Sequence, residues 1–209
     1  MNKEAWAQHI YTTLSPLYPN PAPALDYSTP FQLLVATVLS AQCTDERVNL
    51  VSPTLFARFP TPESMAGAEI EELEAIIYST GFYRAKALAL KELSQTISIK
   101  HHGQVPDSME ALTALRGVGR KTASVILSAC YQKPAIIVDT HVSRISLRLG
   151  LTTSRDPDKT ERTLALLYRE NQWISIGHSL NRHGRQVCTA RKPACAVCPL
   201  QKECPKQGL

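Results

Sequence analysis

Apolar residues recur along most of this chain at the three- and four-residue spacing of amphipathic helices. The pattern predicts helices over residues 29–42, 45–59, 69–78, 82–99, 108–115, 118–131, 141–149, 157–169 and 176–187. The first of these opens with Thr29-Pro30 and is apolar on most sides, so we expect it to be buried. Asp45 is a candidate N-cap for the second. Strand signals are limited to the short run 135–138. The sequence therefore predicts an all-α fold.

Two proline-containing breaks divide the helical pattern into two predicted domains. One break is the run Pro19–Pro23 and the other is Lys133-Pro134. We expect residues 22–133 to form one helical domain, and residues 1–21 to pack with residues 134–209 in a second. The chain shows neither a signal peptide nor a run of eighteen apolar residues. These features predict a cytoplasmic protein that does not enter a membrane.

Positive charge is concentrated in the second half of the chain. Residues 1–115 contain 7 Lys and Arg against 12 Asp and Glu, whereas residues 116–209 contain 16 against 6. The basic side chains near the C-terminus are Arg182, Arg185, Arg191, Lys192, Lys202 and Lys206. Many proteins carry a solvated face of Lys and Arg, but a bias of this strength favours a surface for a polyanion, above all nucleic acid.

Four of the six cysteines fall in the last 22 residues, as Cys188-x6-Cys195-x2-Cys198-x5-Cys204. A tail that small buries little apolar surface, so we expect a metal centre to supply its folding energy. Zinc ribbons usually bring two Cys-x-x-Cys pairs and this tail has one, so spacing alone favours zinc and a [4Fe–4S] cluster about equally. A disulfide pair is a third alternative, which requires an oxidising compartment. Cys43 and Cys130 are expected to be isolated buried thiols.

The segment Leu115-Arg116-Gly117-Val118-Gly119-Arg120-Lys121 joins two predicted helices. Glycines two residues apart allow a tight turn and a close approach of the backbone to a ligand. The turn leads directly into a helix N-terminus, where N–H groups and the positive end of the helix dipole favour phosphate. A Gly-x-Gly turn alone is more often an ordinary connection between helices. The adjacent Arg120-Lys121 pair and the basic second half of the chain favour phosphate binding.

Lys121 and Asp139 are the candidates for chemistry. The helix dipole disfavours an ammonium in the first turn, which makes a neutral, nucleophilic amine easier to populate at Lys121. Taken locally, an exposed lysine that binds phosphate is the more common role. Asp139 follows an apolar run and precedes a helix, so its simplest role is an N-cap. An aspartate near a hairpin lysine would also provide a carboxylate that activates the amine.

Together these elements resemble the endonuclease III family of base-excision DNA glycosylases, within the helix-hairpin-helix superfamily. The matching stretches, in order, are LLVATVLSAQCTDERVN, GFYRAKA, LRGVGRKTASVIL, IIVDTHVSRISLRLGL and the closing set of cysteines. The resemblance covers nearly the whole chain. It implies two helical domains, with damaged double-stranded DNA lying across the cleft between them. It also implies a [4Fe–4S] cluster held by Cys188, Cys195, Cys198 and Cys204.

The resemblance further implies roles for individual residues. Lys121 corresponds to the family's Schiff-base lysine and Asp139 to its catalytic aspartate. Gln42 matches the residue that fills the gap left by the extruded nucleotide, and Phe82 matches an apolar wedge. The implied contacts to DNA are Gly117, Gly119, Arg120, His141, Arg191 and Lys192. The implied protein is a monomeric, nucleoid-associated DNA glycosylase and AP lyase. It would excise oxidised or ring-saturated pyrimidines and cleave the strand by β-elimination.

Two positions depart from the family pattern. Phe82 stands where relatives often have leucine, and Arg116 stands where they usually have proline. A larger aromatic wedge would stack more broadly and alter the preference for the lesion or the opposite base. Arg116 loosens the entry to the hairpin but leaves both glycines in place.

Two other functions compete with this interpretation. One is a monofunctional, adenine-specific glycosylase, although in the resemblance such relatives lack the lysine and usually carry an extra C-terminal domain. The other is a non-catalytic DNA-binding module with a structural metal.

Overall fold

The computed structural model describes residues 2–19 and 24–209. All regular secondary structure in these two ranges is helical. The chain divides into two compact units, a central unit of Pro23–Gln132 and a discontinuous unit of Met1–Ala22 with Lys133–Leu209. Most of the predicted linker Pro19–Pro23 lies outside the described residues. None of the described helices is long and apolar enough to span a bilayer.

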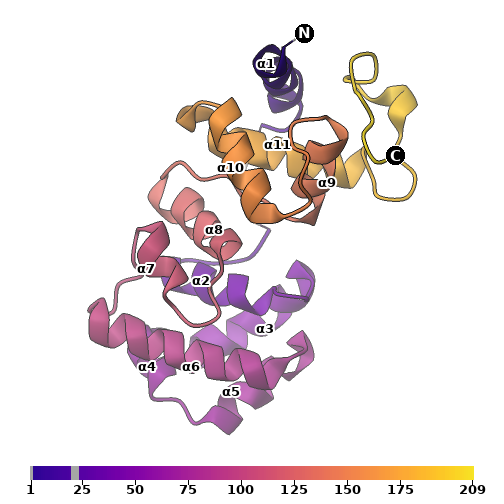
Figure 1. Cartoon of the computed structure of the whole chain (residues 1–209). Coiled ribbons are helices and arrows are strands. Elements are labelled where there is room, and N and C mark those ends of the chain that lie inside the picture. Colours follow the sequence, from indigo (N-terminus) through magenta and orange to yellow (C-terminus); the bar gives the residue numbers. More distant parts are fainter. Residues whose placement is uncertain (1, 20–23) are drawn as a thin grey trace. The chain divides into compact units, whose positions relative to one another are not determined.

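The central unit is built from seven α-helices and one 3₁₀ helix in its described residues (Figure 1). They are α2 (Pro30–Leu39), α3 (Asp45–Arg58), α4 (Pro62–Ala66), α5 (Ile70–Ile77), η2 (Tyr78–Thr80), α6 (Tyr83–Lys100), α7 (Met109–Thr113) and α8 (Arg120–Tyr131). Eight of the ten residues of α2 are buried, as its apolar pattern predicts. Helices α6 and α8 both pack against α2, so the hairpin before α8 is anchored on the core of this unit.

The discontinuous unit joins the N-terminal helix to the last third of the chain. Its helices are α1 (Lys3–Leu14), η1 (Ser15–Leu17), α9 (Thr140–Arg148), α10 (Pro157–Leu167), η3 (Glu170–Gln172), α11 (Trp173–Gln186) and η4 (Cys195–Val197). The indole N–H of Trp6 donates to the carbonyl of Leu149 at 2.7 Å, which fixes α1 on the end of α9. Leu200 of the cysteine-rich tail is fully buried in the same core. The tail is therefore packed into this unit.

The structure corrects several local predictions. Thr44, and not Asp45, is the N-cap of α3, because its hydroxyl accepts a hydrogen bond from the N–H of Arg47. Asp45 instead occupies the first turn, where its charge favours the helix dipole. Residues 135–138 lack strand pairing in the described structure and form a largely buried connection between α8 and α9. Helix α4 has only five residues, too few for a periodic signal. Cys43 and Cys130 are half-buried and not fully buried.

Candidate functional site

Lys121 lies one residue inside α8, and its side chain is exposed. The helix begins after Gly119, which has no side chain that could cap the first N–H groups. The positive end of the helix dipole therefore faces the hairpin without a built-in anion. Buried Leu115 and Val118 anchor the turn, and the N–H of Val118 donates to the carbonyl of Leu115 at 3.2 Å. The hairpin thus presents a lysine and a helix N-terminus to solvent from a rigid base.

The two hairpin glycines differ in what they require. Gly117 has φ +77°, and a Cβ there would lie 3.1 Å from the Cβ of Ala89. An L-residue is therefore disfavoured at Gly117 both by backbone conformation and by packing. Gly119 has φ −89°, and a Cβ added there would meet no atom of the described structure within 4 Å. Its missing side chain leaves open space on the outer side of the turn.

Arg116, at the entry to the hairpin, lies on its surface. Its guanidinium is 3.5 Å from a carboxylate oxygen of Glu92 on α6, and both side chains are well exposed. Such a pair contributes little to stability.

Asp139 is the N-cap of α9, and both of its carboxylate oxygens accept hydrogen bonds from neighbouring groups. One oxygen, Oδ1, accepts from the N–H groups of His141 at 2.9 Å and Val142 at 2.8 Å. The other, Oδ2, accepts from the side-chain amide of Asn181 on α11 at 2.7 Å. Three donors hold the carboxylate in one orientation. Nothing in the local sequence pattern marks Asn181, because it reaches Asp139 from 42 residues away.

His141 follows Asp139 in the first turn of α9 and is half-buried. Burial lowers the pKa of its imidazole, and Arg144 and Arg185 lower it further, while Asp139 opposes them. The ring therefore favours its neutral form. A neutral imidazole still has one N–H that can donate to a phosphate oxygen.

Gln42 and Phe82 lie on two loops of the central unit, each directly after a helix end. Both residues have left-handed backbones, with φ +54° for Gln42 and φ +49° for Phe82. Non-glycine residues pay about 1–2 kcal/mol for this conformation, so it persists only where the surroundings impose it. Gln42 is exposed, and Phe82 leaves 67% of its surface exposed. An exposed aromatic ring held on strained backbone is a candidate for contact with a ligand.

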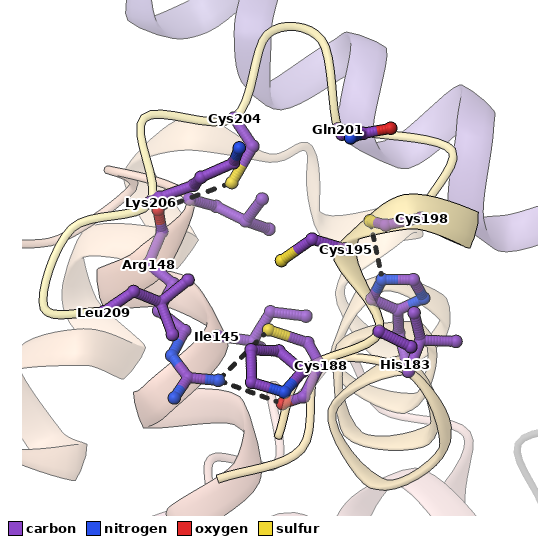
Figure 2. Close-up of a pocket in the computed structure, with 14 residues that line it drawn as sticks. Ile145, Arg148, His183, Cys188, Cys195, Cys198, Gln201, Cys204, Lys206 and Leu209 are labelled. Atoms are coloured by element: carbon purple, nitrogen blue, oxygen red, sulfur yellow. Dashed lines mark hydrogen bonds between the residues drawn. The ribbon is translucent and has the colours of Figure 1, made fainter. Parts of the chain in front are cut away.

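The four C-terminal cysteines meet around one space in the discontinuous unit. Figure 2 shows the sulfurs of Cys188, Cys195, Cys198 and Cys204 facing a common cavity. Cys188 directly follows α11, Cys195 and Cys198 bracket η4, and Cys204 comes from the last loop. All six cysteines of the chain are free, which excludes the disulfide alternative in this structure. Burial raises the pKa of the Cys198 and Cys204 thiols, and the charges of the other cysteines in the set raise it further.

These thiols fit a multi-atom cluster better than a single ion. Four ligands of one zinc ion would each lie about 2.3 Å from a common point. In the part of the chain that the structure describes, no three His, Cys, Asp or Glu side chains are placed to hold one metal ion. The cysteines nevertheless share one cavity. Four thiols around one cavity are a donor set that suits an iron–sulfur centre.

Two arginines of α9 stabilise the first cysteine loop, which runs from Cys188 to Cys195. Arg148 is 6% exposed and donates to the carbonyls of Thr189 at 2.7 Å and Ala190 at 2.9 Å. It also lies 3.4 Å from the sulfur of Cys188 (Figure 2). Arg144 donates to the carbonyls of Gly184 at 2.6 Å and Cys188 at 3.0 Å. Both arginines belong to the basic second half of the chain, yet their guanidinium groups donate to backbone carbonyls of the protein itself.

Two side chains, Tyr18 and His183, connect the N-terminal segment to the cysteine site. The imidazole Nε2 of His183 lies 3.4 Å from the sulfur of Cys198, and its Nδ1 lies 3.1 Å from the hydroxyl of Tyr18. His183 is almost fully buried, and burial lowers its pKa. The ring is therefore neutral, with one nitrogen donating and the other accepting.

The basic side chains predicted on the tail are exposed. Arg191 and Lys192 lie on the loop between Cys188 and Cys195, which Arg148 and the Thr189 hydroxyl stabilise from within. The other four, Arg182, Arg185, Lys202 and Lys206, are exposed as well. A loop that is fixed inside and basic outside is suited to contact a polyanion.

Comparison with known proteins agrees with this fold and site. Residues 35–170 match the HhH-GPD superfamily of base excision DNA repair proteins, and residues 188–204 match the iron-sulfur binding domain of endonuclease III. Endonuclease III of Synechocystis is 47% identical over 98% of this chain and 94% of its own length. Endonuclease III of Escherichia coli K12 is 36% identical over 98% of this chain and 96% of its own. A solved trapped endonuclease III–DNA covalent intermediate has 38% identity and a TM-score of 0.92, covering 99% of this chain and 97% of its own.

The chain is thus a base-excision DNA repair protein of the helix-hairpin-helix class. Within that class it belongs to the endonuclease III family of DNA N-glycosylases and AP lyases, and its cofactor is a [4Fe–4S] cluster. The all-α fold, the enzyme class and the cofactor predicted from the sequence are confirmed.

Proposed function

We propose that this enzyme excises oxidised or ring-saturated pyrimidines from double-stranded DNA and then cleaves the strand 3′ to the lesion by β-elimination. In this proposal Lys121, as a neutral amine, attacks C1′ of the extruded nucleotide. The base leaves with the electron pair of its glycosidic bond and is protonated, which gives an N-glycoside on Lys121. The C1′–O4′ bond of the sugar ring then breaks, O4′ takes up the proton lost by the attacking amine, and a protonated imine remains between Lys121 and C1′. Loss of a proton from C2′ then breaks the C3′–O bond. The observation that carries the proposal is the exposed amine in the first turn of an uncapped helix.

The hairpin would hold the DNA backbone while this happens. The N–H groups at the start of α8, with Arg120 beside them, are suited to bind a phosphate at the positive end of the helix dipole. Gly117 provides the tight turn, and the open space at Gly119 lets a phosphate approach the backbone. In the discontinuous unit, His141, Arg191 and Lys192 would contact phosphates as well.

Gln42 and Phe82 would stabilise the duplex from which the nucleotide has been removed. Extruding a nucleotide costs unpairing and unstacking energy, which side chains inserted into the gap can offset. Gln42 offers an amide that can hydrogen-bond to the unpaired opposite base, and Phe82 offers a ring that can stack. Both are exposed and held on strained backbone before any DNA is bound.

Asp139 would stabilise the positive charge that develops on the sugar, or assist in removing a proton from the amine. Its three hydrogen bonds fix the orientation of the carboxylate, and electrostatic stabilisation needs a group that is already oriented before the reaction. Its capping role and its proposed catalytic role are compatible, because the cap orients the group.

We further propose Cys188, Cys195, Cys198 and Cys204 as the ligands of the [4Fe–4S] cluster. The cluster would stiffen the basic loop and has no part in the glycosidic chemistry. A thiolate of Cys198 can only accept a hydrogen bond, so His183 would donate from Nε2 and accept from the Tyr18 hydroxyl at Nδ1. The monomeric, nucleoid-associated enzyme of the cytoplasm predicted from the sequence stays part of this proposal.

Borohydride trapping tests the proposal directly. The wild-type protein is incubated with duplexes that each carry one defined lesion, and with a duplex carrying an abasic site. Borohydride reduces an imine to a stable amine, so we expect a covalent protein–DNA complex and strand cleavage at oxidised pyrimidines. A wild-type protein that never traps on abasic DNA would exclude the imine mechanism. Trapping on abasic DNA without cleavage at any oxidised pyrimidine would exclude the substrate class alone.

Asp139→Asn is expected to slow turnover by about 10²-fold or more, while affinity for abasic DNA stays near that of wild type. Asparagine still caps a helix well, so α9 is retained. Its neutral amide, however, loses the negative charge that the sugar requires. Single-turnover cleavage and equilibrium binding measure the two effects separately.

Asp156→Asn is a matched control, because Asp156 caps α10 in the same unit through a 2.8 Å hydrogen bond from Lys159 N–H. It should leave turnover unchanged. A large loss of affinity in Asp139→Asn, with little change in turnover of the bound complex, would show that Asp139 is only structural.

The two hairpin glycines should respond to alanine in different ways. Gly117→Ala should destabilise the protein by about 1–2 kcal/mol, because φ +77° and Ala89 both oppose a Cβ. Gly119→Ala meets no steric conflict, so it should cost less stability than Gly117→Ala, and only because alanine is a poorer N-cap than glycine. It should nevertheless weaken DNA binding by filling the space that a phosphate would use. Denaturant unfolding and DNA titration distinguish them. Unchanged affinity in Gly119→Ala would remove this turn from the proposed phosphate contacts.

A further inference from the structure

Lys86 is a buried lysine in the first turn of α6, inside the GFYRAKA segment. Only 6% of its surface is exposed, and its ammonium donates to two carbonyls, that of Leu39 and that of Thr80, each at 2.8 Å. Leu39 is the last residue of α2 and Thr80 the last residue of η2. Both acceptors are themselves almost fully buried. One side chain therefore hydrogen-bonds to the last carbonyls of two helices that are far apart in the sequence.

Keeping a lysine there is costly. Burial lowers the pKa of Lys86, and the nearby Cys43 thiol only partly opposes this. An ammonium at the C-terminal end of α2 gains from the helix dipole and from two carbonyls that would otherwise lack partners. Removing it would leave those carbonyls unsatisfied. A methionine would fill the same space with no desolvation cost, so the charge must serve a local purpose.

The two helix ends that Lys86 holds are those from which the proposed gap-filling residues project. Gln42 follows Leu39 by three residues, and Phe82 follows Thr80 by two. Both residues adopt a left-handed backbone within two or three residues of the carbonyl that Lys86 binds. Such conformations persist only when the surrounding structure fixes them. The contact from α6 supplies that fixation for both loops at once.

We propose that Lys86 is a positioning residue that sets the spacing of the Gln42 and Phe82 loops for insertion into a duplex. The inference rests on the proposed function and names the group that orders its gap-filling side chains. Lys86 touches neither the DNA nor the reacting atoms. Lys86 should therefore affect only the reaction on duplex DNA, where the extruded nucleotide leaves a gap that must be filled. A single strand has no such gap.

The test compares strand cleavage at an abasic site in a duplex with cleavage at the same site in a single-stranded oligonucleotide. Lys86→Met should lower kcat/KM on the duplex by about 10²-fold, because misplaced gap-filling side chains leave the extruded nucleotide poorly oriented for attack. Cleavage of the single strand should change little. Lys86→Arg, which keeps the charge and several N–H donors, should restore part of the duplex rate. Should Lys86→Met not fold, Lys86→Gln gives the same comparison.

Lys91 provides a matched control on the same helix. Its ammonium donates to the carbonyl of Ala68 at 2.7 Å, between α4 and α5, and touches neither loop. Lys91→Met should lower stability without changing the ratio of duplex to single-strand cleavage. A Lys86→Met ratio equal to that of Lys91→Met overturns the inference.

A double-mutant cycle gives an independent measure. If Lys86 acts through the loops, adding Lys86→Met to the Gln42→Ala/Phe82→Ala variant should produce little further loss on the duplex. Full additivity would overturn the inference. A wild type that cleaves neither substrate overturns the proposed function together with this inference. An active wild type with an unchanged ratio in Lys86→Met overturns the inference alone.

Discussion

Lys121→Arg should abolish borohydride trapping and strand cleavage on abasic DNA, while affinity for the duplex changes by less than about tenfold. Arginine keeps the positive charge at the start of α8, so it preserves any contact with phosphate. Its guanidinium stays protonated at all accessible pH values and cannot form an imine. Loss of a covalent nucleophile lowers turnover by about 10⁴-fold or more. Trapping gels and equilibrium titration measure the two effects separately.

Two further variants complete this experiment. Lys121→Ala removes the charge as well as the amine, so a difference in affinity from Lys121→Arg isolates the phosphate contact. Lys100→Arg changes an exposed lysine at the end of α6 and should trap like the wild type. Continued trapping by Lys121→Arg would place the imine on another amine. Normal turnover in Lys121→Arg would make Lys121 a phosphate contact only.

The helices could be predicted because each depends on signals that are local in the sequence. Thr29-Pro30 marks the start of α2 and Gly119 the start of α8, and both helices begin within a residue or two of the predicted positions. The buried face of α2 follows directly from its apolar composition. The predicted end of α2 was less accurate. Helix α2 ends at Leu39 and not at Gln42, because the N–H groups of Ala41 and Cys43 donate to carbonyls three residues back and not four.

Tertiary hydrogen bonds could not be predicted, because their partners are far apart in the sequence. Asn181 reaches Asp139 over 42 residues, and Lys86 reaches Leu39 over 47. The count of basic residues over 116–209 includes Arg144 and Arg148, yet both donate to backbone carbonyls near Cys188. Net charge reports only which side chains are present. Which of them are exposed depends on packing that composition does not encode.

The identity of the metal centre could not be predicted from the spacing of the cysteines alone. Spacing left zinc and a cluster about equally favoured, whereas the arrangement of the sulfurs around one cavity favours the larger group. The contacts of Arg148 with the sulfur of Cys188 and of His183 with the sulfur of Cys198 are visible only in the structure. Such contacts orient ligands and tune the centre they hold.

Cys198→Ser is expected to remove the cluster and unfold the tail of the discontinuous unit. The wild type should contain about four iron atoms per chain with visible iron–sulfur absorption, and the variant should lose both. Leu200 lies in the core of this unit two residues from Cys198, so losing the tail opens that core. A lost metal centre costs about 4 kcal/mol or more of stability. Iron analysis and denaturant unfolding measure the two losses.

Fluorescence separates the two units in this experiment, because both tryptophans, Trp6 and Trp173, belong to the discontinuous unit. In Cys198→Ser the unfolding transition followed by tryptophan fluorescence should shift to a lower denaturant concentration. The helical signal of the central unit should persist at denaturant concentrations above that transition. Cys130→Ser, a half-buried thiol in α8 of the central unit, should keep full iron content and an unchanged tryptophan transition. Retained iron in Cys198→Ser would remove that residue from the ligand set. A colourless wild type containing zinc would contradict the cluster itself, since four thiolates then bind a single ion.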